Sequence, residues 1–369
     1  MSTAIDTPVR RTRRRLVGPI VAIVIAALLF IVPFLNVPTF GILPNNLNRP
    51  GSLQVLAVVL TICALAVTFD IVFGYTGLLS FGHAMFFTLG GYGFAMTLKL
   101  TDLGFGVAVL VGILASIVGA VFVNAIALRA TGVAFSMVTL AVAQLINIMI
   151  SRNYFGSGGE EGLTLPFQAM PTFFIGIRNT QNLYWLALAL LIIVVALALW
   201  VTSTRLGHSW KAVRENELRM KVMGVNTYLT KLSATVIASV LAGACGIVYV
   251  IVLGTAEPKI SGLLFSLSLI VMVVLGGRGR IWGAVLGAAL YTLLEQRLPT
   301  VAALPAIADL PAVFRIPLSE PQLLLGIAFI IFIYALPGGI TGGIRSALDK
   351  RTARRQAIGL PATSARDIH

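Results

Sequence analysis

Long apolar stretches separated by short polar ones make up most of this sequence. A helix needs about 20 residues to cross a hydrocarbon layer of about 30 Å, and apolar runs near that length recur from Leu16 toward the carboxyl end. Such continuous runs favour helices over barrel strands, because each span must satisfy its own backbone hydrogen bonds. The pattern predicts an all-α, polytopic transmembrane helical bundle of about 8 to 10 spans. The ranges expected to be helical are 16–35, 53–73, 84–98, 103–128, 131–151, 182–202, 229–252, 262–276, 281–297 and 322–336.

The segments after residue 258 are short for complete spans, and re-entrant or broken helices are an open alternative there. Composition supports a membrane protein, with 58% hydrophobic and 11% charged residues against roughly 25% charged in soluble domains. Cys63 and Cys245 lie inside apolar runs and are expected to be small core residues rather than a disulfide.

The net charge of +14 raises nucleic-acid binding as a possibility, but the placement of the basic residues argues for a membrane and against nucleic acid. Most of them fall in segments that share one side if the amino terminus is inside, as the positive-inside rule requires. We expect a bacterial inner-membrane protein with both termini cytoplasmic. The expected parts are a basic segment 1–15, a transmembrane domain 16–344 whose first span is uncleaved, and a disordered basic tail 345–369.

One charged island interrupts the apolar pattern. WKAVRENELRMKVMGVN begins at Trp210, and seven charges fall between Arg205 and Lys221. We expect a surface helix over 209–223, capped by Ser209 and ended by Gly224, with Asn226 or Thr227 capping the next helix. Trp210, Val213, Met220 and Met223 would pack on the bundle, whereas Arg214, Glu215, Glu217, Arg219 and Lys221 would meet another surface. Contact with anionic lipid headgroups is the alternative, but two carboxylates favour a protein socket.

Three stretches in one order resemble the permease family of branched-chain amino acid ABC transporters, the LivM-like family. They are RLGHSWKAVRENELRMKVMGVNTYLTKL, FGYTGLLSFGHAMFFTLGGY at 73–92 and VLGGRGRIWGAVLGAAL at 274–290. The resemblance implies that segment 205–226 docks on an ATP-hydrolysing subunit. The positions that it assigns to ATPase coupling are Arg214, Glu215, Asn216, Glu217, Arg219 and Gly224.

The resemblance also implies the partners and the energy source. They are two ABC ATPase subunits, a second related permease and an extracytoplasmic solute-binding protein, with membrane lipid around the bundle. The sequence contains no G-x-x-x-x-G-K-[ST] phosphate loop, so we expect a non-enzymatic subunit that binds no cofactor, with ATP and Mg used by the partner. The expected solute is a branched-chain or related amino acid, and urea or a short-chain amide is the alternative.

Polar residues within the predicted spans are candidates for a solute path. If each residue turns about 100°, one face of 131–151 carries Ser136, Thr139, Gln144 and Asn147. Interhelical hydrogen bonding explains this face as well as a translocation pathway does.

A glycine-rich motif follows the second predicted span, at Gly74, Gly77, Gly82 and His83, and favours close helix approach or a broken helix. His83 is expected to be packed and hydrogen-bonded rather than a metal ligand. Asp70 and Glu295 are expected to be ions at the membrane interface.

Two other classes of function remain open from the sequence. A secondary transporter or channel would be expected to carry more buried ionisable residues for ion coupling. A membrane scaffold with no transport role would leave the polar face of 131–151 without a purpose.

Overall fold

The predicted helices form in the computed structural model, which describes residues 27–35, 46–101, 103–175, 179–302, 321–335 and 338–343. The segment 1–15, most of the first predicted span and the tail 345–369 lie outside the described residues. In chain order the helices and strands are α2 (Pro50–Asp70), a π-helical segment (Ile71–Thr76), α3 (His83–Leu100), α4 (Phe105–Ala127), α5 (Val133–Ser151), β1 (Leu163–Thr164), α6 (Thr180–Ser203), α7 (Arg205–Glu215), α8 (Glu217–Val222), α9 (Thr227–Leu253), β2 (Thr255–Ala256), α10 (Leu263–Gly276), α11 (Ile281–Ala302) and α14 (Pro321–Ala335). Short 3₁₀ turns lie at Val32–Phe34, Gly159–Glu161, Phe167–Ala169, Thr172–Phe174 and Pro258–Ser261.

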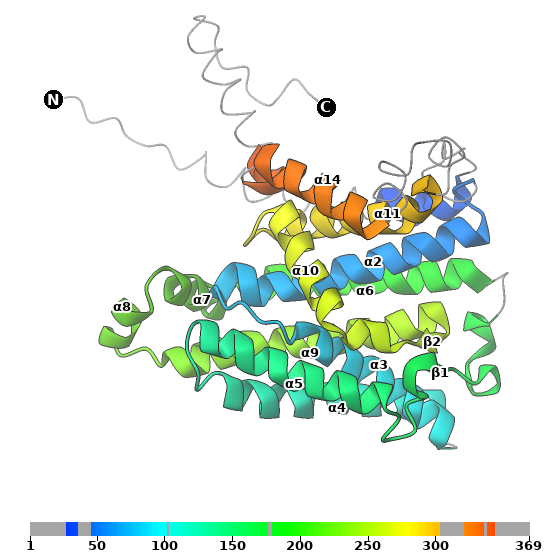
Figure 1. The fold of residues 1–369 in the computed structure, drawn as a ribbon, viewed down its shortest axis with the longest axis horizontal. Coiled ribbons are helices and arrows are strands. Elements are labelled where there is room, and N and C mark those ends of the chain that lie inside the picture. Colours follow the sequence, from blue (N-terminus) through cyan, green and yellow to red (C-terminus); the bar gives the residue numbers. More distant parts are fainter. Residues whose placement is uncertain are drawn as a thin grey trace, which may run out of the picture.

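The helices pack side by side in one bundle, with α2 at its centre (Figure 1). α2 contacts α6, α9, α10 and α11, and it is buried on nearly all sides. Such burial fits a helix that is apolar around its whole circumference. α4 and α5 lie on one flank against α3, whereas α14 lies on the opposite flank along α11.

Five described helices are long and apolar enough to cross a membrane: Pro50–Thr76, Phe105–Ala127, Val133–Ser151, Thr180–Ser203 and Thr227–Leu253. Two shorter apolar helices, Leu263–Gly276 and Leu323–Phe332, fall after residue 258, where short segments are predicted. The all-α membrane bundle is therefore confirmed, with five helices of spanning length among the described residues against the 8 to 10 spans predicted from the whole chain.

Glycines allow α3 and α9 to cross at very short range. A Cβ added to Gly90 would overlap the backbone of Gly243, and one added to Gly246 would overlap the carbonyl oxygen of Phe87. α9 also contacts α4, where Ser116 lies against Gly243. Small residues at helix crossings replace the hydrophobic driving force, which is absent within lipid, by close van der Waals packing.

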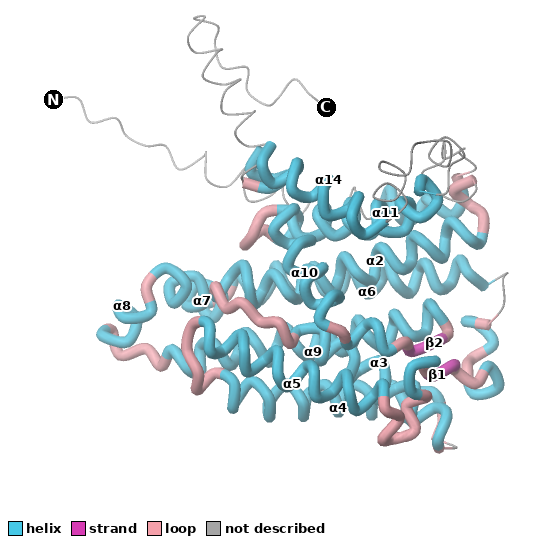
Figure 2. The backbone as a smooth tube through the Cα atoms, in the orientation of Figure 1, coloured by secondary structure: helices cyan, strands magenta, loops and turns pink. Residues whose placement is uncertain are grey.

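The two short strands lie at one end of the bundle, and α7 and α8 lie at the other (Figure 2). β1 and β2 pair antiparallel, with Leu163 opposite Ala256. The hydroxyl of Tyr92 on α3 donates to the carbonyl of Ala256 at 2.9 Å. The long connection between α5 and α6 is thereby fixed to the ends of α3 and α9.

Candidate functional site

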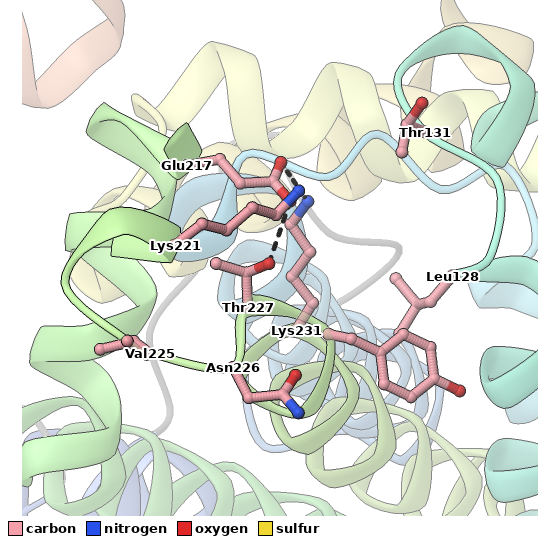
Figure 3. Close-up of a pocket in the computed structure, with 10 residues that line it drawn as sticks. Leu128, Thr131, Glu217, Lys221, Val225, Asn226, Thr227 and Lys231 are labelled. Atoms are coloured by element: carbon pink, nitrogen blue, oxygen red, sulfur yellow. Dashed lines mark hydrogen bonds and ion pairs between the residues drawn. The ribbon is translucent and has the colours of Figure 1, made fainter. Parts of the chain in front are cut away.

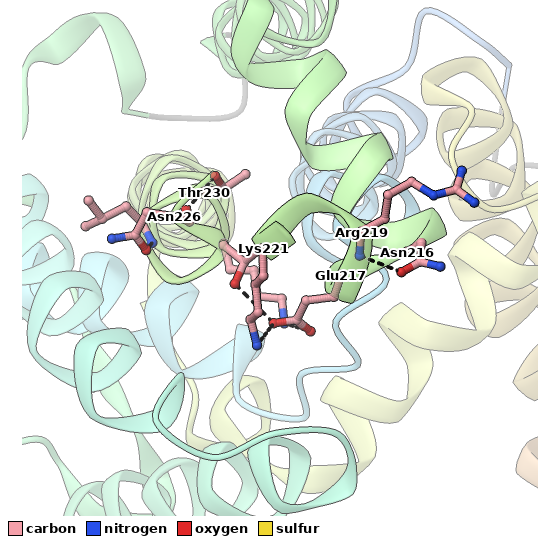
Figure 4. Close-up of polar contacts among 9 residues, drawn as sticks. Asn216, Glu217, Arg219, Lys221, Asn226 and Thr230 are labelled. Atoms are coloured by element: carbon pink, nitrogen blue, oxygen red, sulfur yellow. Dashed lines mark hydrogen bonds and ion pairs between the residues drawn. The ribbon is translucent and has the colours of Figure 1, made fainter. Parts of the chain in front are cut away.

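The charged island forms two helices, α7 and α8, rather than the single helix predicted over 209–223. The backbone of Asn216 is extended, with φ −158° and ψ 98°, and separates them. Its side chain accepts a hydrogen bond from the backbone N–H of Arg219 at 2.9 Å and so caps α8 (Figure 4). An N-cap asparagine satisfies one of the free N–H groups of a helix start, which accounts for the break.

The prediction that Ser209 caps the helix is wrong. α7 begins four residues earlier, at Arg205, after the extended Thr204. Ser209 lies within α7, and its hydroxyl donates to the carbonyl of Arg205 at 3.0 Å. Such bonding to the preceding turn is an alternative use of a serine hydroxyl inside a helix.

α7 is anchored on the bundle by its apolar face, as predicted for Trp210 and Val213. Both side chains are buried. The indole N–H of Trp210 donates to the hydroxyl of Ser233 on α9 at 3.1 Å. Gly207 allows α7 to approach Thr202 at the end of α6 closely. The amphipathic α7 is therefore fixed against α6 and α9.

α8 presents apolar side chains to the surroundings. Leu218, Val222 and Met223 are 74%, 88% and 70% exposed, and we call these three residues the α8 apolar patch. The prediction that Met223 packs on the bundle is wrong, because the break at Asn216 turns α8 away from the face that buries Trp210. Met220 is half-buried. Contiguous exposed apolar residues are typical of interaction sites.

The carboxylate of Glu217 joins α8 to the start of α9. It accepts from the ammonium of Lys231 at 2.7 Å and from the hydroxyl of Thr227 at 3.2 Å, and it pairs with Lys221 at 3.2 Å (Figure 3). The hydrogen bond from Lys231, with a smaller contribution from Lys221, lowers the pKa of Glu217 below its usual value. These groups line an open pocket of about 460 Å³ that also borders Leu128. Glu217 therefore has partners within the chain.

Gly224 ends α8 as predicted, with φ +80°. The N–H of Val225 donates to the carbonyl of Met220 at 3.1 Å, and the N–H of Gly224 donates to that of Lys221 at 3.0 Å. This pair of bonds is a Schellman motif. Asn226 then caps α9, accepting from the N–H of Leu229 at 3.1 Å.

Replacement of Gly224 tests the backbone conformation at this turn. A Cβ here would meet no atom within 4 Å, so only the positive φ opposes a side chain. We expect Gly224→Val to destabilise the turn by about 1 to 2 kcal/mol, and Gly224→Asn to cost less because asparagine tolerates this conformation. Hydrogen exchange of the α8 amides measures both variants, and equal exchange rates would contradict the assignment.

The other island residues differ in their contacts. Arg214 donates a hydrogen bond to the carbonyl of Gly74 in the π-helical segment, and its stem lies beside Gly77. The ammonium of Lys211 lies 5.1 Å from the ring centre of Tyr75. Glu215 and Arg219 are exposed. Arg214 thus faces the bundle, contrary to the prediction that it meets another surface.

The glycine-histidine motif lies where α2 gives way to α3. Gly77, with φ +76°, ends the π-helical segment, and α3 starts at His83 after a short irregular stretch. The ring Nε2 of His83 lies 2.9 Å from the hydroxyl of Thr68. The ring is buried and makes edge contacts with Phe69 and Phe86. His83 is therefore packed and hydrogen-bonded, and among the described residues no group of three His, Cys, Asp or Glu could hold a metal ion.

The polar face of α5 divides into two parts. Ser136 and Thr139 are buried, and Ser136 donates to the carbonyl of Leu79 at 2.6 Å. Gln144 and Asn147 are half-buried. The side-chain oxygen of Asn147 accepts from the hydroxyl of Ser261 at 2.7 Å. The first pair holds α5 against the stretch before α3, whereas the second pair has partial access to the surroundings.

Asp70 is fully buried, so the prediction of an interfacial ion is wrong for this residue. Its carboxylate accepts from the backbone N–H of Gly279, 209 positions away, at 2.8 Å. The partner is a loop amide, which no local pattern in the sequence indicates. Glu295 is exposed, as predicted. Cys63 and Cys245 are buried free thiols.

Comparison with known proteins places these features in a family context. The family model described as a branched-chain amino acid transport system permease component matches residues 51–336. This range includes the island, the glycine-histidine motif and the loop that holds Gly279. No solved structure matches the chain.

Curated relatives are distant but consistent. The high-affinity branched-chain amino acid transport system permease protein LivM of Salmonella typhimurium is 25% identical over 268 residues, covering 67% of this chain and 63% of the relative. LivH of Escherichia coli is 23% identical over 252 residues, covering 64% and 80%. BraD of Pseudomonas aeruginosa is 24% identical over 249 residues, covering 64% and 81%. The match thus spans less than two thirds of the length of the Salmonella LivM.

Proposed function

The chain belongs to the family of branched-chain amino acid transport permease components, and on that premise we propose that it is the transmembrane subunit of an ABC importer. In this proposal it moves a branched-chain or related amino acid by alternating access. Two separate ATPase subunits supply the energy. The chain itself binds no nucleotide, and the absence of a phosphate-loop motif from its sequence supports this division.

The α7–α8 element carries the proposal. α7 is anchored by the buried Trp210, whereas α8 leaves its apolar patch exposed at one end of the bundle. The exposed Glu215 and Arg219 add charges of both signs beside this patch. An apolar centre with a mixed charged rim fits a protein partner better than a lipid surface. We assign this element to contact with the ATPase.

The basic residues of the island support a cytoplasmic position for this end. In the same orientation both termini are cytoplasmic, in the bacterial inner membrane. The opposite end, with the paired strands β1 and β2, then faces an extracytoplasmic solute-binding protein. A second, related permease completes the transporter in this proposal, and the similarity of one chain to both LivM and LivH supports such a pair.

Gln144 and Asn147 are the residues of α5 that we assign to the solute path. Uncharged hydrogen-bonding groups suit a zwitterion because they bind polar groups without a counter-charge. We expect Gln144→Leu with Asn147→Leu to reduce uptake by roughly tenfold, the effect of losing one to two hydrogen bonds to a charged solute. Uptake assays on normally assembled complexes measure this, and Met137→Leu, an exposed position on the same helix, is the control. Unchanged uptake in the double variant would remove α5 from the path.

Reconstitution tests the function as a whole. The chain, its ATPases, the second permease and a binding protein are placed in vesicles, and uptake of radiolabelled leucine, urea and acetamide is followed. The proposal expects ATP-dependent leucine uptake. Uptake of only urea or acetamide would establish the alternative solute class. Uptake by the chain alone that needs an ion gradient and no ATP would overturn the proposal in favour of a secondary transporter.

A further inference from the structure

The three sequence motifs that carry the family resemblance meet at one point in the structure. Arg214 comes from α7 in the charged island, Gly74 from the π-helical segment, and Gly279 from the loop 277–280 between α10 and α11. Arg214 bonds to the carbonyl of Gly74, and Asp70 bonds to the N–H of Gly279. We call these four residues the junction. It connects the island to three membrane helices, α2, α10 and α11.

Glycine is required at three positions around the junction. A Cβ on Gly74 would overlap both the Asp70 carboxylate and the amide of Gly279. A Cβ on Gly279 would lie 3.0 Å from the Arg214 guanidinium, and one on Gly77 would lie 3.1 Å from the Arg214 stem. Gly77 and Gly279 also have positive φ, at +76° and +73°. Backbone from two distant segments is thus packed directly around the two charged side chains.

The loop 277–280 is held from further directions. The guanidinium of Arg278 lies 5.4 Å from the ring centre of Phe73 in the π-helical segment. The hydroxyl of Thr341 donates to the carbonyl of Gly276 at 2.8 Å. The loop therefore moves with the segments that it contacts rather than freely.

The choice of a carboxylate at position 70 calls for an explanation beyond fixing a loop. Asp70 is fully buried, and its second oxygen has no hydrogen-bond partner within the described residues. Burying a carboxylate for one backbone bond is costly, and a neutral acceptor would hold the loop at lower cost. Asp70 and the Arg214 guanidinium attract each other across the junction. That attraction ties the loop to α7.

We propose that Asp70 and Arg214 are positioning residues that transmit displacement of α7 to α2, α10 and α11. This proposal rests on the proposed function, in which a partner ATPase moves α7 and α8. Arg214 holds the π-helical segment through the Gly74 carbonyl, and Asp70 holds the α10–α11 loop through the Gly279 amide. A movement of α7 then reaches three helices at once, two of which surround the central α2.

The test compares uptake per ATP hydrolysed in the reconstituted complete transporter. We expect Asp70→Leu, which removes the acceptor, and Arg214→Met, which keeps the stem but removes the donor, each to lower this ratio by roughly tenfold. ATPase co-purification and basal ATP hydrolysis should stay near wild type. Asp70→Asn keeps an acceptor for Gly279 and should retain most of the ratio. Arg129→Met, the same substitution at an exposed arginine after α4, is the matched control.

The ratio separates transmission from a structural role. A junction that only stabilises the fold would lower assembly, hydrolysis and uptake together and leave the ratio unchanged, which would overturn the inference. An unchanged ratio in Arg214→Met, a surface variant that should fold, would overturn it as well. Failure of the proposed function is distinguishable, because the wild-type complex would then show no ATP-dependent uptake at all.

Discussion

Gly246→Val is expected to prevent the bundle from assembling. Its side chain would enter the space of the Phe87 carbonyl, where α9 and α3 cross. Overpacking a core typically costs about 1 to 3 kcal/mol, and here the clash is with backbone on a helix that contacts α2, α3, α4 and α6. We expect a loss of more than about 3 kcal/mol, measured as the yield of monodisperse protein in detergent and its thermal midpoint.

Gly106→Val is the control for that substitution. Gly106 lies in the first turn of α4, and a Cβ there would meet no atom within 4 Å. Valine at this position should change stability only by its small difference in helix propensity from glycine. If Gly246→Val gave the same yield and midpoint as Gly106→Val, the close crossing of α3 and α9 would be incorrect.

Leu218→Glu combined with Val222→Glu is expected to abolish binding of the ATPase. The two side chains form most of the α8 apolar patch. Buried apolar residues at the centre of an interface commonly contribute 2 kcal/mol or more, so introducing two charges should weaken the complex by at least about thirtyfold. The two residues contact little of the bundle, so the variant should still insert and fold. Co-purification of the ATPase with the tagged permease measures the loss.

Leu218→Met with Val222→Ile provides the matched control, since it keeps both positions apolar and similar in size. This variant should bind the ATPase as the wild type does. Undiminished co-purification with the double glutamate variant would show that the ATPase contacts another surface. Equal loss in both double variants would indicate that α8 had lost its shape rather than its apolar character.

Helix positions could be predicted well because they depend on local composition. The range 229–252 corresponds to α9 at Thr227–Leu253, and 182–202 corresponds to α6 at Thr180–Ser203. In both helices a long apolar run fixes the element, and the polar residues at its ends fix its limits within a few positions. Gly224 was also predictable, since a glycine after a helical pattern favours the left-handed end.

The organisation of the island was harder to predict, for a physical reason. Asn216 stands in the middle of a segment whose periodicity suits one helix, and its capping bond to Arg219 competes with helix continuation. Periodicity does not show which of the two wins. The exposure of Met223 follows from that break, because α8 takes a new direction after Asn216.

Contacts between distant segments were not predictable from one sequence. Asp70 and Gly279 lie 209 positions apart, and nothing near either residue indicates the other. Arg214 could be placed in a coupling segment by resemblance, but its bond to Gly74 depends on how α7 lies against the π-helical end of α2. The individual candidate residues were therefore visible in the sequence, whereas their joining into a junction was not.

α9 is one unbroken helix of 27 residues, about 40 Å long at 1.5 Å per residue. Lys231 in its first turns holds Glu217 of α8, and directly after its other end β2 pairs with β1. A hydrogen-bonded helix resists compression along its axis. An axial push applied at the charged end would therefore arrive almost undiminished at the strand pair on the opposite side of the membrane, as through a piston rod.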